Sequence, residues 1–161
     1  MQGRVLIIAG SDSGGGAGIQ ADIKSVTGLG GYAMTAITAL TVQDTKGVHE
    51  IYDVPTDFIM DQIRVVVQDI GVDCIKTGML HRVEVVEVVS QAIQQYARQV
   101  PIIVDPVMIA KGGATLLEQS AIGAIKELII PYTTLLTPNI PEASALAGIE
   151  ITTPEEAIVA A

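Results

Sequence analysis

Polar residues stand at the ends of several apolar segments of this chain, and the first of them that could recognise a ligand is Gln43. Its side-chain amide places a hydrogen-bond donor beside an acceptor, which suits a heteroaromatic ring that carries an amine next to a ring nitrogen. A solvated loop glutamine is the commoner reason for such a residue. Recognition of a ring by Gln43 is therefore a hypothesis, and it requires that the side-chain amide faces a cavity.

Residues 10–18 (GSDSGGGAG) form a stretch too rich in glycine for regular structure. It is not a Walker A motif, because no Gly-Lys-Ser/Thr follows, and Ile19 stands where a dinucleotide fingerprint needs its third glycine. Two interpretations stay open: a flexible turn, or a backbone wall that approaches a flat ligand closely. In the second interpretation Asp22, on the helix that follows, faces the same cavity, although it also suits the helix dipole.

Three further residues carry oxygen atoms that could bind a metal ion. Asp105 ends an apolar segment, where a carboxylate either accepts loop N–H groups or holds a metal-bound water. Asn139 and Glu142 are three residues apart at a helix start, so both can offer oxygen ligands to Mg²⁺ on one side. Glu142 is equally a favourable first-turn residue. His49 and His81 have no ligand spacing around them and are expected in loops or at the surface.

Length and charge narrow the class of protein. A chain of 161 residues with 49% hydrophobic content predicts one globular domain over residues 1–161. The formal net charge is −9 and Lys and Arg number only nine, which argues against a nucleic-acid surface. An anionic substrate must then be met locally, by a metal ion, backbone N–H groups or one placed cation.

The compartment is predicted from the cysteine count and the N-terminal segment. Cys74 is the sole cysteine, so no intramolecular disulfide can form, and it reads as a small buried hydrophobe. The apolar run over residues 5–9 is too short for a membrane span or a signal sequence. These features predict a cytoplasmic protein that does not associate with membranes.

Strand and helix patterns alternate along the chain, which is typical of repeated βα units and predicts an α/β fold with a buried, mostly parallel sheet. Residues 41–47 are polar and are expected to form a loop. Ligands in such folds bind beyond the carboxyl ends of the strands, so the loops there should share one rim. The expected strands are 5–9, 33–40, 74–77, 102–104 and 135–136, and the expected helices are 19–29, 59–70, 86–96, 122–129 and a short one from 139.

The last residues carry a helix-start signal. Thr153 is a good N-cap, Pro154 fits the first helical position, and Glu156 completes a capping box. The chain stops at Ala161 without a C-terminal helix signal. We therefore expect a domain truncated at its C-terminal end.

Five segments, in order along most of the chain, together resemble the hydroxymethylpyrimidine/phosphomethylpyrimidine kinases of the ribokinase-like superfamily. They are residues 8–22 (IAGSDSGGGAGIQAD), 38–43 (TALTVQ), 76–80 (KTGML), 104–108 (VDPVM) and 137–142 (TPNIPE). The resemblance implies a three-layer α/β/α fold, here without its C-terminal part. It also implies two successive ATP-dependent phosphorylations, of 4-amino-5-hydroxymethyl-2-methylpyrimidine and of its monophosphate, in thiamine biosynthesis.

The resemblance also implies roles for particular residues. Gln43 would pair with the pyrimidine, and Asp22 would lie nearby. Asp105, Asn139 and Glu142 would face the region of Mg²⁺ and phosphate, the last two through the superfamily's Asn-x-x-Glu element. The residues expected to line the ring pocket are Gly10, Ala17, Met79 and Val107.

The chain departs from the family at its C-terminal side. Family members have a further lysine-bearing strand and a Gly-Thr-Gly-Cys segment that forms the anion hole and supplies the proposed base, and neither occurs here. Little or no turnover by these 161 residues is therefore expected. Pyridoxal kinase and a non-catalytic binding module are the alternatives, and a homodimer is expected because family members are commonly dimers.

Overall fold

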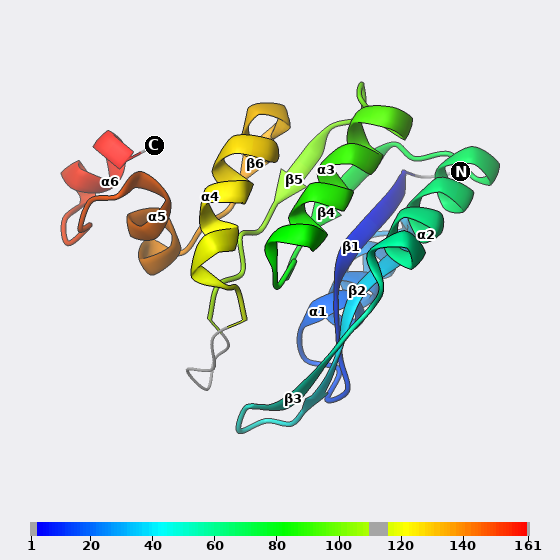
Figure 1. Cartoon of the computed structure of the whole chain (residues 1–161), viewed down its shortest axis with the longest axis horizontal. Helices are drawn as coiled ribbons and strands as arrows, with labels where there is room; N and C mark the ends of the chain where they lie inside the picture. Colours follow the sequence, from blue (N-terminus) through cyan, green and yellow to red (C-terminus); the bar gives the residue numbers. More distant parts are fainter. Residues whose placement is uncertain (1–2, 110–115, 161) are drawn as a thin grey trace.

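A six-stranded mixed sheet forms the centre of the computed structural model, which describes residues 3–109 and 116–160 (Figure 1). Its strand order is β3-β2-β1-β4-β5-β6. Every neighbouring pair is parallel except β2 and β3, which are antiparallel. The predicted α/β fold with a mostly parallel sheet is therefore confirmed. The strands are β1 (Arg4–Asp12), β2 (Tyr32–Gln43), β3 (Val48–Asp53), β4 (Cys74–Thr77), β5 (Ile102–Val104) and β6 (Leu135–Leu136).

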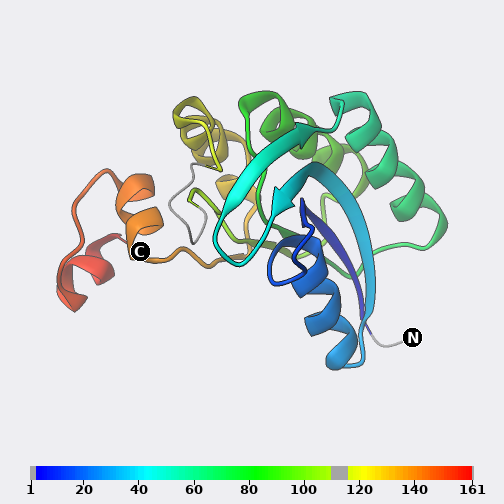
Figure 2. The same ribbon diagram turned by 90° about the horizontal axis from the view of Figure 1, so that it is seen from below.

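Helices cover the sheet on two sides, which gives three layers (Figure 2). Helix α1 packs on β1 and β2 from one side, whereas α2, α3 and α4 lie in a row on the other. Helices α5 and α6 follow β6 at the end of the chain. The helices are α1 (Gly18–Gly28), α2 (Thr56–Asp69), α3 (Val83–Tyr96), α4 (Gln119–Leu128), the 3₁₀ helix η1 (Ile130–Tyr132), α5 (Ile140–Ala147) and α6 (Pro154–Ala160).

The core reflects the apolar spacing of the helices. Ile59 and Ile63 of α2 are fully buried against the sheet, as their separation of one helical turn predicts. Gly71, with a φ of +77°, follows the end of α2 and provides the left-handed conformation that ends a helix. At α6 the predicted capping box is confirmed, because Glu156 N donates to Thr153 Oγ1 and Thr153 N donates to Glu156 Oε2, at 3.2 and 3.0 Å.

The loop expected over residues 41–47 is wrong in part. Residues 41–43 continue β2, and the following strand β3, which the sequence pattern did not reveal, pairs antiparallel with it. This hairpin lies at the edge of the sheet and β3 has no fully buried residue, so the segment resembles a loop in composition. A register shift between Val42 and Gln43 interrupts the pairing where the hairpin borders the cavity described below.

Arg4, at the start of β1, joins that strand to the segment before β4. Its guanidinium donates to both oxygens of Asp73, at 2.9 and 2.7 Å, and its backbone N–H donates to the same carboxylate at 2.8 Å. These hydrogen bonds from Arg4 hold the pKa of Asp73 well below its usual range. The pair therefore favours the folded state once the carboxyl group is ionised.

We expect Asp73→Asn to lower the melting temperature at neutral pH and to have a diminishing effect as the pH falls below about 4, the ordinary pKa of an unfolded Asp. A depressed folded-state pKa gives stability that is present above the unfolded pKa and lost on acidification. Thermal unfolding from pH 7 to pH 2.5 measures the difference, with Glu87→Gln, on the exposed face of α3, as the control. A difference that is constant with pH would contradict the linkage.

No helix in the described parts of the chain is both long and apolar enough to cross a membrane.

Candidate functional site

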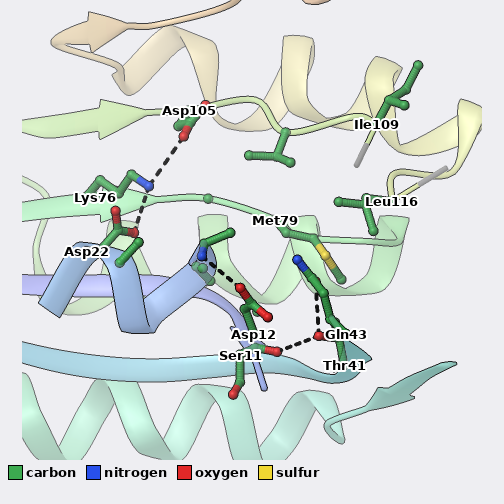
Figure 3. A pocket seen from close by; sticks show the side chains of 17 residues that line it. Ser11, Asp12, Asp22, Thr41, Gln43, Lys76, Met79, Asp105, Ile109 and Leu116 are labelled. Atoms are coloured by element: carbon green, nitrogen blue, oxygen red, sulfur yellow. Dashed lines mark hydrogen bonds and ion pairs between the residues drawn. The ribbon is translucent and has the colours of Figure 1, made fainter. Parts of the chain in front are cut away.

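A cavity of about 310 Å³ lies at the carboxyl ends of β1, β2, β4 and β5 (Figure 3). Its volume is at the lower end of the range for small-molecule sites. The structure brings all six predicted substrate residues to its wall, together with Asp105. The six are Gly10, Ala17, Asp22, Gln43, Met79 and Val107.

The glycine-rich segment is an ordered turn held by the carboxylate of Asp12, which sequence reasoning did not single out. Asp12 accepts N–H groups from Gly14, Gly16 and Ala17, at 2.7, 2.8 and 2.8 Å. These three amides point to a carboxylate of the same segment, so they are not offered to an anionic ligand. The wall interpretation is thus the one the geometry favours. An aspartate followed by several glycines was the available signal, because Asp side chains commonly accept N–H groups a few residues ahead.

Helix α1 is tied to this turn through Gln20. The Gln20 amide accepts the backbone N–H of Asp12 at 2.8 Å and donates to Ser11 Oγ at 2.7 Å. Both ends of the amide are engaged, so the start of α1 and the end of β1 hold each other in place. The cavity wall is consequently formed before any ligand arrives.

Gln43 is fixed at its backbone and reaches the cavity with its side chain. Ser13 Oγ accepts the Gln43 N–H and donates to the Gln43 carbonyl, both at 2.8 Å. One end of the side-chain amide contacts Thr41 Oγ1 at 3.2 Å, and the other points into the cavity (Figure 3). The structure thus places the Gln43 amide at the cavity, and its pairing with a heteroaromatic ring stays a prediction.

Lys76 of β4 lies between two carboxylates at the cavity. Its Nζ is 2.7 Å from Asp22 Oδ2 and 3.4 Å from Asp105 Oδ2. The side chains of Lys76 and Asp22 are each 22% exposed, so this ion pair is partly shielded from solvent. The Asp105 carboxylate thus meets a lysine, a contact that the sequence gave no reason to expect. Among the described residues that line the cavity, Lys76 is the cation that offsets Asp12, Asp22 and Asp105.

Asn139 and Glu142 bond each other at the start of α5. Glu142 N donates to Asn139 Oδ1 and Asn139 N donates to Glu142 Oε2, both at 2.9 Å, which is a capping box. Glu142 Oε1 accepts Met108 N at 3.4 Å, and Glu142 is 6% exposed.

The carboxylate and amide oxygens of Asp105, Asn139 and Glu142 are of the kind that binds Mg²⁺. Because they already have partners in the protein, they favour holding a metal-bound water over direct ligation of the metal. Across residues 3–109 and 116–160, no three His, Cys, Asp or Glu side chains gather as a metal site. A magnesium site made from Asp105, Asn139 and Glu142 therefore stays a prediction.

A second cavity of about 420 Å³ adjoins the first, between the glycine-rich turn and the β2–β3 connection. It shares Asp12, Ala17 and Gln43 with the first cavity. On its far wall the backbone N–H groups of Lys46 and Gly47, with His49, keep the pKa of Asp44 below its ordinary value. Gln43 therefore lies where the two cavities meet.

Cys74 and His81, for which the sequence also made predictions, lie outside the cavity. Burial raises the pKa of the Cys74 thiol, so Cys74 lacks the low pKa of a reactive nucleophile. His81 lies in a loop, as predicted, but is half-buried with a φ of +64°, and its Nδ1 is 2.9 Å from the Leu116 carbonyl. The polar and glycine-rich segment that follows residues 102–104 also predicts a loop over residues 108–115, most of which lies outside the described residues.

The family model described as phosphomethylpyrimidine kinase matches residues 12–161. The bifunctional thiamine biosynthesis protein ThiED of Geobacter sulfurreducens is 50% identical over 154 residues, which are 96% of this chain and 31% of the relative. The hydroxymethylpyrimidine/phosphomethylpyrimidine kinase of Bacillus subtilis is 49% identical over 148 residues, which are 92% of this chain and 54% of the relative. The chain thus spans about a third of one curated relative and just over half of the other.

Solved structures agree with the sequence matches. The phosphomethylpyrimidine kinase of Clostridium difficile superposes with a TM-score of 0.90 at 39% identity, over 98% of this chain and 70% of that protein. The pyridoxal kinase of Bacillus subtilis, in an ADP complex, gives 0.89 at 39% identity, over 100% of this chain and 61% of that protein. The family model and the structural match together show that the chain belongs to the phosphomethylpyrimidine kinase family and has its ribokinase-like fold.

Proposed function

We propose that this chain forms the pyrimidine-binding part of an ATP-dependent kinase of thiamine biosynthesis. The substrate would be 4-amino-5-hydroxymethyl-2-methylpyrimidine, and its monophosphate would be the substrate of a second phosphorylation. The proposal depends on one observation: the cavity of about 310 Å³ brings Gln43 together with the other residues that are predicted to contact the ring. The family match and the name of the Bacillus subtilis relative support the same substrates.

The cavity chemistry suits a flat, polar ring. The backbone of the glycine-rich turn forms part of the wall, and Met79, whose polarisable sulfur favours contact with aromatic rings, lies beside Gly10. Gln43 places an amide at the edge, where a donor and an acceptor can pair with an aminopyrimidine. This arrangement would pack wall atoms against the ring and form hydrogen bonds at one of its edges.

ATP and Mg²⁺ are the proposed cofactors. Kinase relatives solved with ADP or AMP-PCP support a nucleotide. Asp105 and Glu142 would hold Mg²⁺ through water, with Asn139 keeping Glu142 in place. A bound Mg²⁺ supplies charge neutralisation for the transferring phosphate.

We expect these 161 residues to bind the pyrimidine with little turnover. Phosphoryl transfer depends on donors and cations placed around the γ-phosphate. In the described part of the cavity Lys76 is occupied by two carboxylates, and the amides of the glycine-rich turn are occupied by Asp12. The further proposals are a single domain over residues 1–161, a cytoplasmic location and a homodimer.

Pyridoxal phosphorylation is the second candidate function, since a pyridoxal kinase superposes almost as well as the phosphomethylpyrimidine kinase does. Both substrates are six-membered heteroaromatic rings, so the shape of the cavity does not separate them. The amine beside a ring nitrogen, which Gln43 would read, favours the pyrimidine.

We expect Gln43→Ala to weaken binding of hydroxymethylpyrimidine to this chain at least about tenfold, because a ligand amine and ring nitrogen lose their partners. Isothermal calorimetry with hydroxymethylpyrimidine and with pyridoxal measures the change. Gln95→Ala, on the exposed face of α3, is the matched control and should bind as the unaltered chain does. Equal binding of both ligands, unaffected at Gln43, would refute the pyrimidine assignment.

A further inference from the structure

The hydroxyl group of Thr41 stands between two oxygen atoms at the cavity wall (Figure 3). Its Oγ1 is 2.9 Å from the carbonyl oxygen of Ser11 and 3.2 Å from Oε1 of Gln43. A threonine hydroxyl carries one proton, whereas both of its neighbours here are acceptors. The shorter contact takes the proton, so Thr41 donates to Ser11.

This direction of the hydroxyl proton leaves the Gln43 side chain with an unfavourable contact. With the proton directed at Ser11, Thr41 Oγ1 and Gln43 Oε1 face each other at 3.2 Å with no hydrogen between them. The backbone of Gln43 cannot move away, because Ser13 binds both its N–H and its carbonyl group. A half-turn of the side-chain amide relieves the contact, since the two ends of a glutamine amide are nearly equal in size and the last torsion is soft.

Thr41 and Gln43 are also well placed to act together. They are two residues apart in β2, so their side chains lie on the same face of the strand. Thr41 is 9% exposed and is bound to β1 through Ser11, which makes it a rigid partner. One end of the Gln43 amide is thus held by the sheet, and the other end is left for a ligand.

We propose that Thr41 is a positioning residue that fixes the Gln43 amide with Nε2 on Thr41 and Oε1 turned into the cavity. The proposal rests on the proposed function for its ligand. It deepens that function, because an oxygen at this point selects a ring that presents an exocyclic amine there. The remaining N–H of Nε2 can then donate to the ring nitrogen beside the amine. A ligand with only an acceptor at the same point meets one oxygen with another and is disfavoured.

The orientation can be measured without any ligand. In the ¹⁵N-labelled chain we expect nuclear Overhauser effects from the Gln43 side-chain NH₂ protons to the methyl and β protons of Thr41. Contacts of these NH₂ protons with the Met79 methyl group, in place of those with Thr41, would overturn the proposal. This readout does not depend on the identity of the substrate.

The effect on specificity is measured by calorimetry with hydroxymethylpyrimidine and with its analogue that lacks the amine. We expect Thr41→Val, which keeps the shape of the side chain and removes the hydroxyl, to reduce the preference for the amine about tenfold. Thr41→Ser, which keeps the hydroxyl, should retain that preference. An unchanged preference in Thr41→Val, or an equal loss in Thr41→Ser, would overturn the role of Thr41. If the unaltered chain binds neither ring, the proposed function fails, while the NMR contacts still decide the orientation of the amide.

Discussion

Gly18→Ala is expected to lower the free energy of unfolding by about 2–4 kcal/mol, because the added methyl group meets backbone atoms in a strained conformation. Gly18 begins α1 with a φ of +56°, a conformation that side chains rarely adopt. A Cβ atom there would lie within 2.4 Å of the Gly10 carbonyl oxygen and 3.3 Å from Asp12 N. The substitution must therefore displace either the end of β1 or the start of α1, and both form the cavity wall. Urea denaturation followed by circular dichroism measures the loss.

Gly28→Ala is the control in the same helix. No atom lies within 4 Å of a Cβ built at Gly28, and alanine is the better helix former. Its stability should be unchanged or higher by up to about 1 kcal/mol. Hydroxymethylpyrimidine binding should be lost in Gly18→Ala and retained in Gly28→Ala. Equal stability of the two variants would show that the turn is not held as the structure describes.

Much of the fold could be predicted from the sequence, because periodicity and breakers coincide in the helices. The helix expected over residues 59–70 is α2, in which Ile59 and Ile63 share the buried face and after which Gly71 takes a left-handed conformation. The strand β3 was missed for a physical reason. It lies at the edge of the sheet without a fully buried residue, so its composition resembles that of a loop. The segment is a strand because it pairs with β2, and this pairing depends on the tertiary fold and not on the local sequence.

The site was predictable only where the motif segments point to it. These segments located Gln43 and Met79, and the structure brings both to one cavity. Asp12 was missed although the glycines after it were a signal, because which amides its carboxylate accepts depends on the shape of the turn. Asn139 and Glu142 were recognised as a pair, yet their mutual capping contacts depend on where α5 begins.

The partners of Lys76 could be predicted from the sequence even less well. A lysine within an apolar strand has no partner that local sequence can reveal, and Asp22 is 54 residues away along the chain. Parallel pairing of β4 with β1 and β5 brings Asp22 and Asp105 to either side of it. Without the lysine, two carboxylates would face each other across a partly buried cavity edge, where their repulsion is poorly screened.

We expect Lys76→Met to lower the free energy of unfolding by about 2 kcal/mol, because Asp22 loses a partly buried partner while the methionine keeps the apolar stem. Adding Asp22→Asn should restore at least half of the loss, since an uncharged amide needs no counterion. Lys24→Met is the control. It removes a positive charge from α1 whose Nζ contacts only the Gly15 carbonyl and no described carboxylate, so the change should stay within about 0.5 kcal/mol.

Urea denaturation at pH 7 of the unaltered chain, Lys76→Met, Asp22→Asn and the double variant gives the coupling energy directly, with Lys24→Met measured alongside. A loss in Lys76→Met that Asp22→Asn does not relieve would assign the effect to packing. A loss no larger than that of Lys24→Met would mean that the ion pair contributes nothing beyond net charge. Relief by Asp22→Asn, with little change in Lys24→Met, would instead establish Lys76 as the residue that lets two carboxylates share one edge of the cavity.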